Sequence, residues 1–277
     1  FSQMGHRVTA VDSDNSIITP LCNGWSPVEE PGLDELLEEN LNAKRLEFTS
    51  DYAEAIQGKE FIFLSIDLPF DSDYRINLEP VFDAAIEIGQ LRSGDITLCV
   101  TSQVPVGRSE QLAHIIRQEK SFRCDFVYIP EFLRVGAAVE TFQNADRIVI
   151  GSENLVTALR VAELYKPLGR PIMHTDVQSA ETAKHACNAY LATSISFINE
   201  MSDLCKGTGA DIKEVARIMK GDKRIGPFAY LNPGPGFTTG HLERDIRTLQ
   251  ELGYECDCKT ELLNAVMFVN RNRGKKQ

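Results

Sequence analysis

Short apolar runs alternate with stretches of helical periodicity through residues 1–175, and this alternation restricts the possible fold more than any other feature of the sequence. Runs typical of buried strands occupy residues 6–12, 60–66, 95–101, 124–130 and 147–151. Helical patterns lie between them, as at residues 33–40, 78–91 and 108–118. Strands that alternate with helices of this length predict a parallel sheet covered on both faces. The expected fold class is therefore α/β.

Beyond residue 176 the periodicity is helical only. Residues 179–206 contain neither proline nor glycine, which predicts a single helix of roughly 40 Å at about 1.5 Å per residue. The middle of this helix, from Ala186 to Ile198, is poor in charge and must pack between domains or between subunits. We therefore expect a homodimer formed through helix 179–206.

The charge balance excludes several classes of protein. The 29 Lys and Arg residues against 40 Asp and Glu give a net charge of −11, which argues against a nucleic-acid surface. No apolar run reaches the roughly 20 residues of a membrane span, and no export leader opens the sequence, so we expect no membrane partner and a cytoplasmic location. Cys256 and Cys258 form a C-x-C motif without a second pair, so we expect no metal site.

Asp12 is a candidate for the acid that binds the ribose of a dinucleotide. Such sheets open with a strand, a glycine-rich turn and a helix, and the acid follows about 20 residues after the turn. Residues 1–5 fit the last turn of that helix, ended by Gly5, so we expect the first strand and its glycine turn to be missing from the chain. Taken alone, Asp12 is also an ordinary turn residue.

Three further residues can carry chemistry in this pattern. Lys184 and Asn188 stand four residues apart on one face of the long helix, where an ammonium can stabilise an oxyanion and an amide can fix a hydroxyl; the simpler reading is a lysine that reaches solvent. Glu131 follows a buried strand directly, where α/β sheets bind ligands, and is a candidate base or water-orienting group, or else an exposed turn acid.

A loop rich in glycine and proline at residues 232–240 precedes His241 and Asp245. Such a loop brings backbone close to another group. The histidine and the aspartate stand four residues apart at the start of a helix, so they form either an acid/base couple or an ordinary pair on a helix surface.

In this order, the sequence resembles the UDP-glucose/GDP-mannose dehydrogenase family across nearly all of its length. The matching stretches are residues 5–12, 26–33, 104–107, 130–134, 146–151, 179–200 and 231–237. The resemblance implies a Rossmann-like parallel sheet for NAD at residues 1–175, incomplete at its N-terminus. An all-helical central domain with one long helix, used for dimerisation, follows at residues 176–277. The family's C-terminal nucleotide-binding domain is expected to be absent.

The resemblance also implies an activity: such enzymes oxidise the C6 alcohol of a nucleotide sugar twice, through an aldehyde to an acid, and reduce two NAD. It places Glu131, Lys184, Asn188 and Asp245 at catalytic positions. The implied cofactor residues are Asp12 and Gln103. The implied substrate residues are Phe132, Leu133, Arg134, Tyr230, Asn232, Gly234, Gly236 and Phe237.

Three departures from the family pattern matter for the chemistry. The family carries a cysteine nucleophile after the glycine loop, whereas the run 238–245 places His241 there. Val135 replaces an acid and Gln103 a threonine. A thiolate forms a thiohemiacetal whose oxidation gives a thioester, and an imidazole substitutes for it poorly. His241 can instead act as a general base on the C6 hydroxyl or activate water.

Three hypotheses follow. The first is an NAD-dependent dehydrogenase of a nucleotide sugar, with chemistry altered at His241. The second is a non-catalytic relative that binds nucleotide sugar or NAD and has a regulatory or scaffold role. The third is another NAD-dependent reaction on a similar substrate, such as epimerisation.

Overall fold

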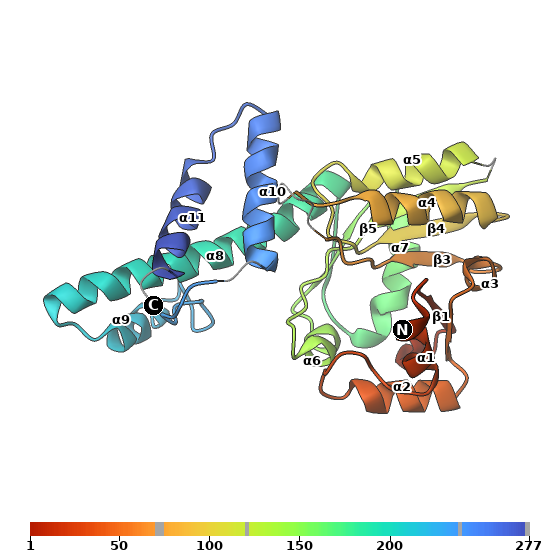
Figure 1. The fold of residues 1–277 in the computed structure, drawn as a ribbon, viewed down its shortest axis with the longest axis horizontal. Helices are drawn as coiled ribbons and strands as arrows, with labels where there is room; N and C mark the ends of the chain where they lie inside the picture. Colours follow the sequence, from red (N-terminus) through yellow and green to blue (C-terminus); the bar gives the residue numbers. More distant parts are fainter. Residues whose placement is uncertain (70–74, 120–121, 238–239, 275–277) are drawn as a thin grey trace. The chain divides into compact units, whose positions relative to one another are not determined.

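The computed structural model describes residues 1–69, 75–119, 122–237 and 240–274, and the chain divides into two compact units. The N-terminal unit contains Phe1–Pro69 and Asn77–Glu181, and the helical unit contains the chain from Thr182 onward together with Arg75 and Ile76. The division falls between Glu181 and Thr182, inside a helix, whereas the sequence prediction set the domain boundary between residues 175 and 176. Figure 1 shows the elements of both units.

The N-terminal unit contains seven strands in two sheets. The strands are β1 (Val8–Val11), β2 (Leu46–Thr49), β3 (Phe61–Leu64), β4 (Ile96–Val100), β5 (Cys124–Tyr128), β6 (Ile148–Gly151) and β7 (Ile172–Thr175). Strands β1 and β2 form a parallel pair, and the larger sheet has the order β3-β4-β5-β6-β7. Pairing in the larger sheet is parallel except between β5 and β6, which are joined antiparallel through Tyr128 and Gly151.

Helices connect these strands. They are η1 (Ser2–Met4), α1 (Asn15–Cys22), α2 (Leu33–Asn42), α3 (Tyr52–Ile56), α4 (Glu79–Leu91), α5 (Ser109–Glu119), α6 (Ala138–Gln143), α7 (Leu155–Tyr165) and η2 (Lys166–Leu168). Helices α4 and α5 lie side by side (Figure 1). Because β6 and β7 run opposite to β3, β4 and β5, right-handed crossovers place α7 on the other face of the sheet from α4 and α5. The predicted α/β fold with a Rossmann-like parallel sheet is confirmed, and it departs from a single parallel sheet in the separate β1–β2 pair and the antiparallel junction.

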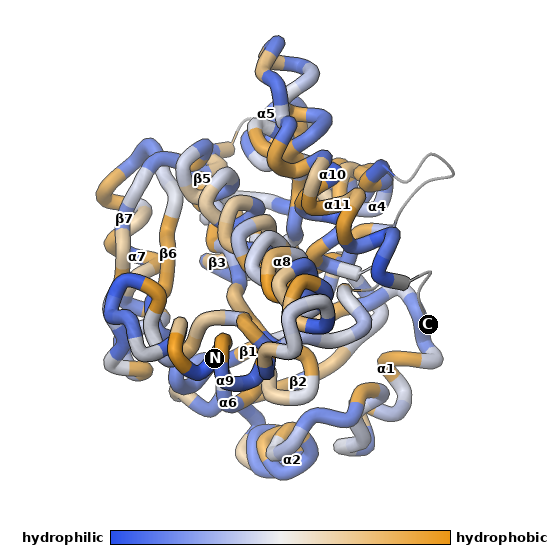
Figure 2. Tube along the Cα trace, turned by 90° about the vertical axis from the view of Figure 1, so that its left-hand side faces the viewer, coloured by the Kyte–Doolittle hydropathy of each residue, from blue (hydrophilic) through white to orange (hydrophobic). Residues whose placement is uncertain are grey.

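One apolar core of the N-terminal unit lies between the larger sheet and α7. All five residues of β4 are buried, and Cys99, Val127, Ile150 and Val161 belong to one apolar cluster between the strands and α7. Figure 2 shows the hydrophobic character of β6 along its length. This burial is what the continuous apolar runs predicted.

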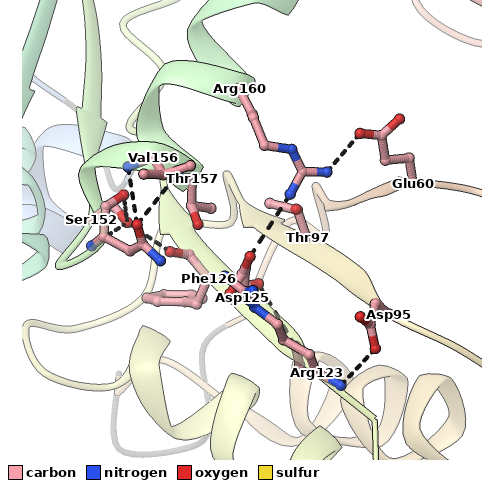
Figure 3. A network of polar contacts seen from close by, with 12 residues as sticks. Glu60, Asp95, Thr97, Arg123, Asp125, Phe126, Ser152, Val156, Thr157 and Arg160 are labelled. Atoms are coloured by element: carbon pink, nitrogen blue, oxygen red, sulfur yellow. Dashed lines mark hydrogen bonds and ion pairs between the residues drawn. The ribbon is translucent and has the colours of Figure 1, made fainter.

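Ion pairs connect α7 to the N-terminal ends of β3 and β5 (Figure 3). The guanidinium of Arg160 on α7 donates to Glu60 at 2.6 Å and lies 3.8 Å from Asp125 on β5. Arg123 donates to the other oxygen of Asp125 at 2.8 Å. The Asp125 side chain is mostly buried, so the network fixes the edge of the sheet more firmly than exposed pairs would.

Thr97 on β4 gives a prediction about stability. Its side chain is completely buried, and within the described residues its hydroxyl has no hydrogen-bond partner. We expect Thr97→Val to raise the free energy of unfolding by about 1 kcal/mol, because a buried unsatisfied hydroxyl is removed. The control Thr141→Val should lower it by about 1 kcal/mol, because the Thr141 hydroxyl donates to Ala137 O at 2.7 Å. Urea denaturation of both variants checks the pair; destabilisation by Thr97→Val would contradict the prediction.

The helical unit is built around the predicted long helix, α8 (Val177–Thr208), which begins in the N-terminal unit. It also contains α9 (Ile212–Lys220), α10 (His241–Glu255) and α11 (Glu261–Gly274). Ala189 and Ala192 on α8 pack with Ile246 on α10 and Met267 on α11 in one apolar cluster. No helix in the described ranges is long and apolar enough to cross a membrane.

The seven cysteines are free thiols in different environments. Cys22, Cys256 and Cys258 are exposed, and Cys99, Cys124 and Cys205 are buried, as expected of small core residues. Among the residues that the structure describes, no three Cys, His, Asp or Glu side chains gather as metal ligands.

This distribution predicts how the thiols react. Burial raises the pKa of Cys124 to about 11 and that of Cys99 further, so only roughly one Cys124 in a thousand is a thiolate at pH 8. We expect Ellman's reagent at pH 8 to titrate Cys22, Cys256 and Cys258 rapidly, and Cys99 and Cys124 only after unfolding. Mass spectrometry after pulse alkylation checks the assignment; rapid labelling of Cys99 in the folded chain would contradict it.

Candidate active site

The carboxyl ends of β3 and β4 form a polar rim in the N-terminal unit. The Ser65 and Thr101 hydroxyls lie 2.7 Å apart. The buried Ser102 hydroxyl accepts from Ile66 N at 2.8 Å and donates to Leu64 O at 3.2 Å. Gln103, a predicted cofactor residue, follows directly and is half-buried. This is the edge at which open α/β sheets bind ligands.

Glu181 fixes the loop behind this rim, a role that sequence reasoning missed. Its completely buried carboxylate accepts from Gly107 N at 2.6 Å, from Ser109 N at 3.2 Å and from the Ser109 hydroxyl. A carboxylate at the start of α5 satisfies amides that lack partners within the helix. An acid at the start of the long helix was visible in the sequence, but its partners lie about 70 residues away and leave no local pattern.

The loop after β5 carries Glu131, Phe132, Leu133 and Arg134. Glu131 and Phe132 are half-buried, whereas Leu133 and Arg134 are exposed. The guanidinium of Arg147 lies 4.2 Å from the centre of the Phe132 ring, which holds that ring in place. Burial, with smaller effects of Cys99 and Glu131, raises the pKa of Tyr165 well above its ordinary value. The negative charge of Glu131 therefore acts on Tyr165, a residue of the apolar core.

Glu30 orders the same loop from a distant part of the chain. Its two carboxylate oxygens accept from Gly136 N at 2.6 Å and from Ala138 N at 2.9 Å. These amides lie at the start of α6, where a negative charge is favourable. The sequence stretch 26–33 was recognised as part of the family pattern, but this role of Glu30 was not foreseen.

Asp12 follows β1 and takes part in a turn. Its Oδ1 accepts from Asp14 N at 2.9 Å, and Asp14 in turn caps α1 by accepting from Ser16 N at 2.7 Å. Asp12 therefore has the turn geometry that the simpler reading foresaw. A role in binding ribose stays a prediction.

The helical unit contains a buried polar cluster centred on Asp245. The Asp245 side chain is completely buried; its Oδ1 lies 2.7 Å from His185 Nδ1, and its Oδ2 accepts from Asn188 Nδ2. His185 and Asn188 lie three residues apart on α8, so both reach α10 from one face. Lys184, half-buried, precedes this pair. The structure thus brings together Asn188 and Asp245 of the predicted set and adds His185, which sequence reasoning missed.

His241 has a different partner from the one foreseen. It is exposed at the start of α10, and its Nδ1 lies 2.8 Å from Nη2 of the buried Arg244. A guanidinium can only donate, so Nδ1 accepts and the ring proton lies on Nε2. In this arrangement the exposed edge of His241 is a hydrogen-bond donor. A role as a base at Nε2 requires the other tautomer.

The glycine/proline loop is held by side chains of α8 and α11. Gly234 N donates to Asn199 Oδ1 at 2.8 Å, and Gly234 O accepts from Arg273 at 3.1 Å. Phe237 N donates to Asn270 Oδ1 at 2.9 Å, and its carbonyl accepts from the same amide at 2.8 Å. The backbone of Gly234 and Phe237 is thus engaged in hydrogen bonds inside the unit.

The other predicted substrate residues near this loop are Tyr230, Asn232 and Gly236. Tyr230 and Asn232 are exposed, and Asn232 accepts from Lys220 at 3.4 Å. Gly236 has φ 98°, a conformation that favours glycine. Thr238 and Thr239, where the sequence analysis places the start of the departure from the family pattern, lie outside the described residues.

Comparison with protein families identifies the chain. Residues 1–169 match the NAD-binding domain of the UDP-glucose/GDP-mannose dehydrogenase family, and residues 178–272 match its central domain. The chain belongs to this family.

Individual relatives cover nearly the whole chain. UDP-glucose 6-dehydrogenase YwqF of Bacillus subtilis is 38% identical over 274 residues, which are 98% of this chain and 62% of the relative. UDP-glucose 6-dehydrogenase of Rhizobium meliloti is 37% identical over 281 residues, 99% of this chain and 64% of the relative. The structure of a UDP-glucose dehydrogenase from Pyrobaculum islandicum superposes with a TM-score of 0.94 at 32% identity, covering 98% of this chain and 64% of that one. The chain thus spans less than two thirds of the length of these relatives.

Proposed function

We propose that this chain is the NAD-binding and central part of a nucleotide-sugar dehydrogenase that oxidises the C6 hydroxyl of a UDP-sugar, as UDP-glucose 6-dehydrogenases do. The observation that carries the proposal is the buried cluster of Asp245, His185 and Asn188 beside Lys184. Burying a carboxylate and its donors is unfavourable for stability unless every partner is satisfied. A chain without chemistry at this position is more stable with apolar side chains there.

The proposed NAD-binding residues have side chains that can form hydrogen bonds with a dinucleotide. The proposed ribose acid is Asp12, at the carboxyl end of β1, and Gln103 belongs to the polar rim after β4. NAD supplies the acceptor for the hydride that leaves C6. The chain's own residues supply the positioning of the alcohol and the acceptance of its proton.

The proposed roles of the chain's residues follow from their chemistry. Asn188 orients the C6 hydroxyl, the Lys184 ammonium stabilises the oxygen as it loses its proton, and Asp245 holds Asn188. Glu131 is the proposed base or water-orienting group of the N-terminal unit. Phe132, Leu133, Arg134, Tyr230 and Asn232 are proposed to contact the nucleotide sugar. Gly234, Gly236 and Phe237 act through the shape of their loop.

The start of α10 decides how far the oxidation proceeds. His241 stands at the proposed nucleophile position, and as an Nε2 donor it stabilises an oxyanion rather than forming a covalent adduct. Full oxidation to the acid therefore proceeds through the hydrated aldehyde. One NADH per sugar indicates release of the aldehyde, and two indicate the acid.

The alternative is a non-catalytic relative that binds nucleotide sugar or NAD and acts in regulation or as a scaffold. The observation that favours it is the same exposed His241, which contacts Arg244. The family resemblance adds Val135 and Gln103, at positions where it implies an acid and a threonine. Isothermal calorimetry separates the two proposals, because the alternative requires binding without turnover.

We also propose a homodimer through α8. Tyr190, Phe197 and Leu204 lie seven residues apart on this helix and are exposed, so they form one apolar stripe. Multi-angle light scattering at micromolar concentration should give twice the chain mass of 30.9 kDa; a monodisperse monomer would contradict the proposal.

The test of the proposed function is NADH absorbance. UDP-glucose, UDP-N-acetylglucosamine, UDP-N-acetylmannosamine and GDP-mannose are offered in turn with NAD. The assay uses the chain alone and the chain joined to the segments of the Bacillus subtilis relative that it does not span. NADH with a UDP-sugar supports the proposal, and binding without NADH from any of the four supports the alternative.

A further inference from the structure

His185 is a completely buried, hydrogen-bonded histidine to which the sequence assigned no role. We propose that it is a positioning residue of the dehydrogenase: its Nδ1–H orients Asp245, and Asp245 then turns the carbonyl oxygen of Asn188 toward the substrate hydroxyl. The inference rests on the proposed function. It adds to that function the atom that orients the substrate hydroxyl, Asn188 Oδ1.

The first step is the direction of the His185–Asp245 bond. Asp245 accepts from the Asn188 amide at one oxygen and lies 2.7 Å from His185 Nδ1 at the other. A carboxylate only accepts, so Nδ1 carries the ring proton and donates it. The Nδ1 proton is held by a partner 60 residues away on another helix.

The second step is the orientation of the Asn188 amide. Its Nδ2 faces Asp245, so its Oδ1 points away from Asp245, on the other side of the Cβ–Cγ bond. Reversing the amide would set its oxygen against a carboxylate oxygen in a buried position, which is strongly unfavourable. Asn188 therefore presents an acceptor, and the group that it recognises is a hydroxyl that donates.

The third step joins the two. His185 Nδ1–H and Asn188 Nδ2–H both donate to the Asp245 carboxylate, and the substrate hydroxyl donates to Asn188 Oδ1, so the four groups form one hydrogen-bonded chain that converges on Asp245. Such chains polarise their members and fix their geometry. Because Asp245 is completely buried and both of its oxygens are engaged, it acts by orienting Asn188, and His185 acts through it.

Three substitutions test which atom of His185 matters. Asparagine places its Nδ2 where histidine has Nδ1, glutamine places its Nε2 near the position of histidine Nε2, and leucine has no donor. We expect His185→Asn to keep kcat within about threefold of the wild type. His185→Gln and His185→Leu should lower kcat by about a hundredfold, with little change in KM. Thermal denaturation shows what fraction of each variant is folded, and rates are given per folded chain.

The outcomes separate this inference from the proposed function. A purely structural role predicts that activity follows stability, whereas the inference predicts that the asparagine and glutamine variants differ at equal stability. NADH formation by the wild type with equal kcat for all three variants would overturn the role of His185 alone. A downfield imidazole proton in the NMR spectrum, present in wild type and lost in His185→Gln, supports the bond independently of turnover; its absence in wild type would overturn the inference.

Discussion

Replacing Asp245 with alanine is expected to abolish activity and to destabilise the helical unit. Asp245 is the acceptor for two donors of α8, and its removal leaves the buried His185 and the half-buried Asn188 without that partner. Each such loss lowers the free energy of unfolding by about 1–3 kcal/mol. NADH formation should fall by about a thousandfold, since Asn188 loses its orientation.

The control is Asp222→Ala in the same unit. Asp222 is a partly exposed acid whose partner is the exposed Arg224, and hydrogen bonds from Arg224 lower its pKa. Because solvent screens this pair, neither stability nor activity should change measurably. Guanidinium denaturation and initial rates are measured for both variants. Equal stability of Asp245→Ala and the wild type would show that the buried cluster does not hold α10 to α8.

Gly236→Ala is expected to have the second largest effect, on substrate affinity. At φ 98° an added Cβ is strained by about 1–2 kcal/mol, and it would overlap the Oδ1 of Asn270. Asn270 would have to move and release both of its bonds to Phe237. We expect KM for the nucleotide sugar to rise by at least about tenfold, because the loop loses its fixed shape.

Gly234→Ala is the matched control two residues away. A Cβ at Gly234 meets no atom within 4 Å, and its φ lies outside the strained range. The bond from its N–H to Asn199 is unaffected by a methyl group. We expect KM within about twofold of the wild type. Equal KM for both alanine variants would contradict the fixed shape of the loop.

Much of the fold was readable from the sequence, because buried elements leave periodic patterns. The fully buried β4 and the 32-residue α8 were both predicted. Strands β2 and β7 were not, since only part of each is covered and neither has a continuous apolar run. The antiparallel junction between β5 and β6 rests on one residue pair, which no alternation of strands and helices can reveal.

The candidate site shows a different limit. Asn188 and Asp245 were expected at functional positions through the family resemblance, and they do contact each other. His185 was overlooked because its partner lies 60 residues away, and a single histidine on a helix carries no periodic signal. The spacing of four suggested that His241 and Asp245 form a pair. In the structure, Asp245 contacts His185 and His241 contacts Arg244. Spacing indicates which side chains can meet, and packing between helices determines which of them do.

The most direct measurement of the central claim is the amount of NADH released per nucleotide sugar consumed, with product masses read from the same reaction. Wild type and Asp245→Ala are compared at saturating NAD, using the chain joined to the segments of its relative that it does not span. We expect one or two NADH per UDP-sugar for the wild type, with the aldehyde or the acid as product, and NADH formation about a thousandfold slower for Asp245→Ala. A wild type that binds the UDP-sugar but releases no NADH would contradict it.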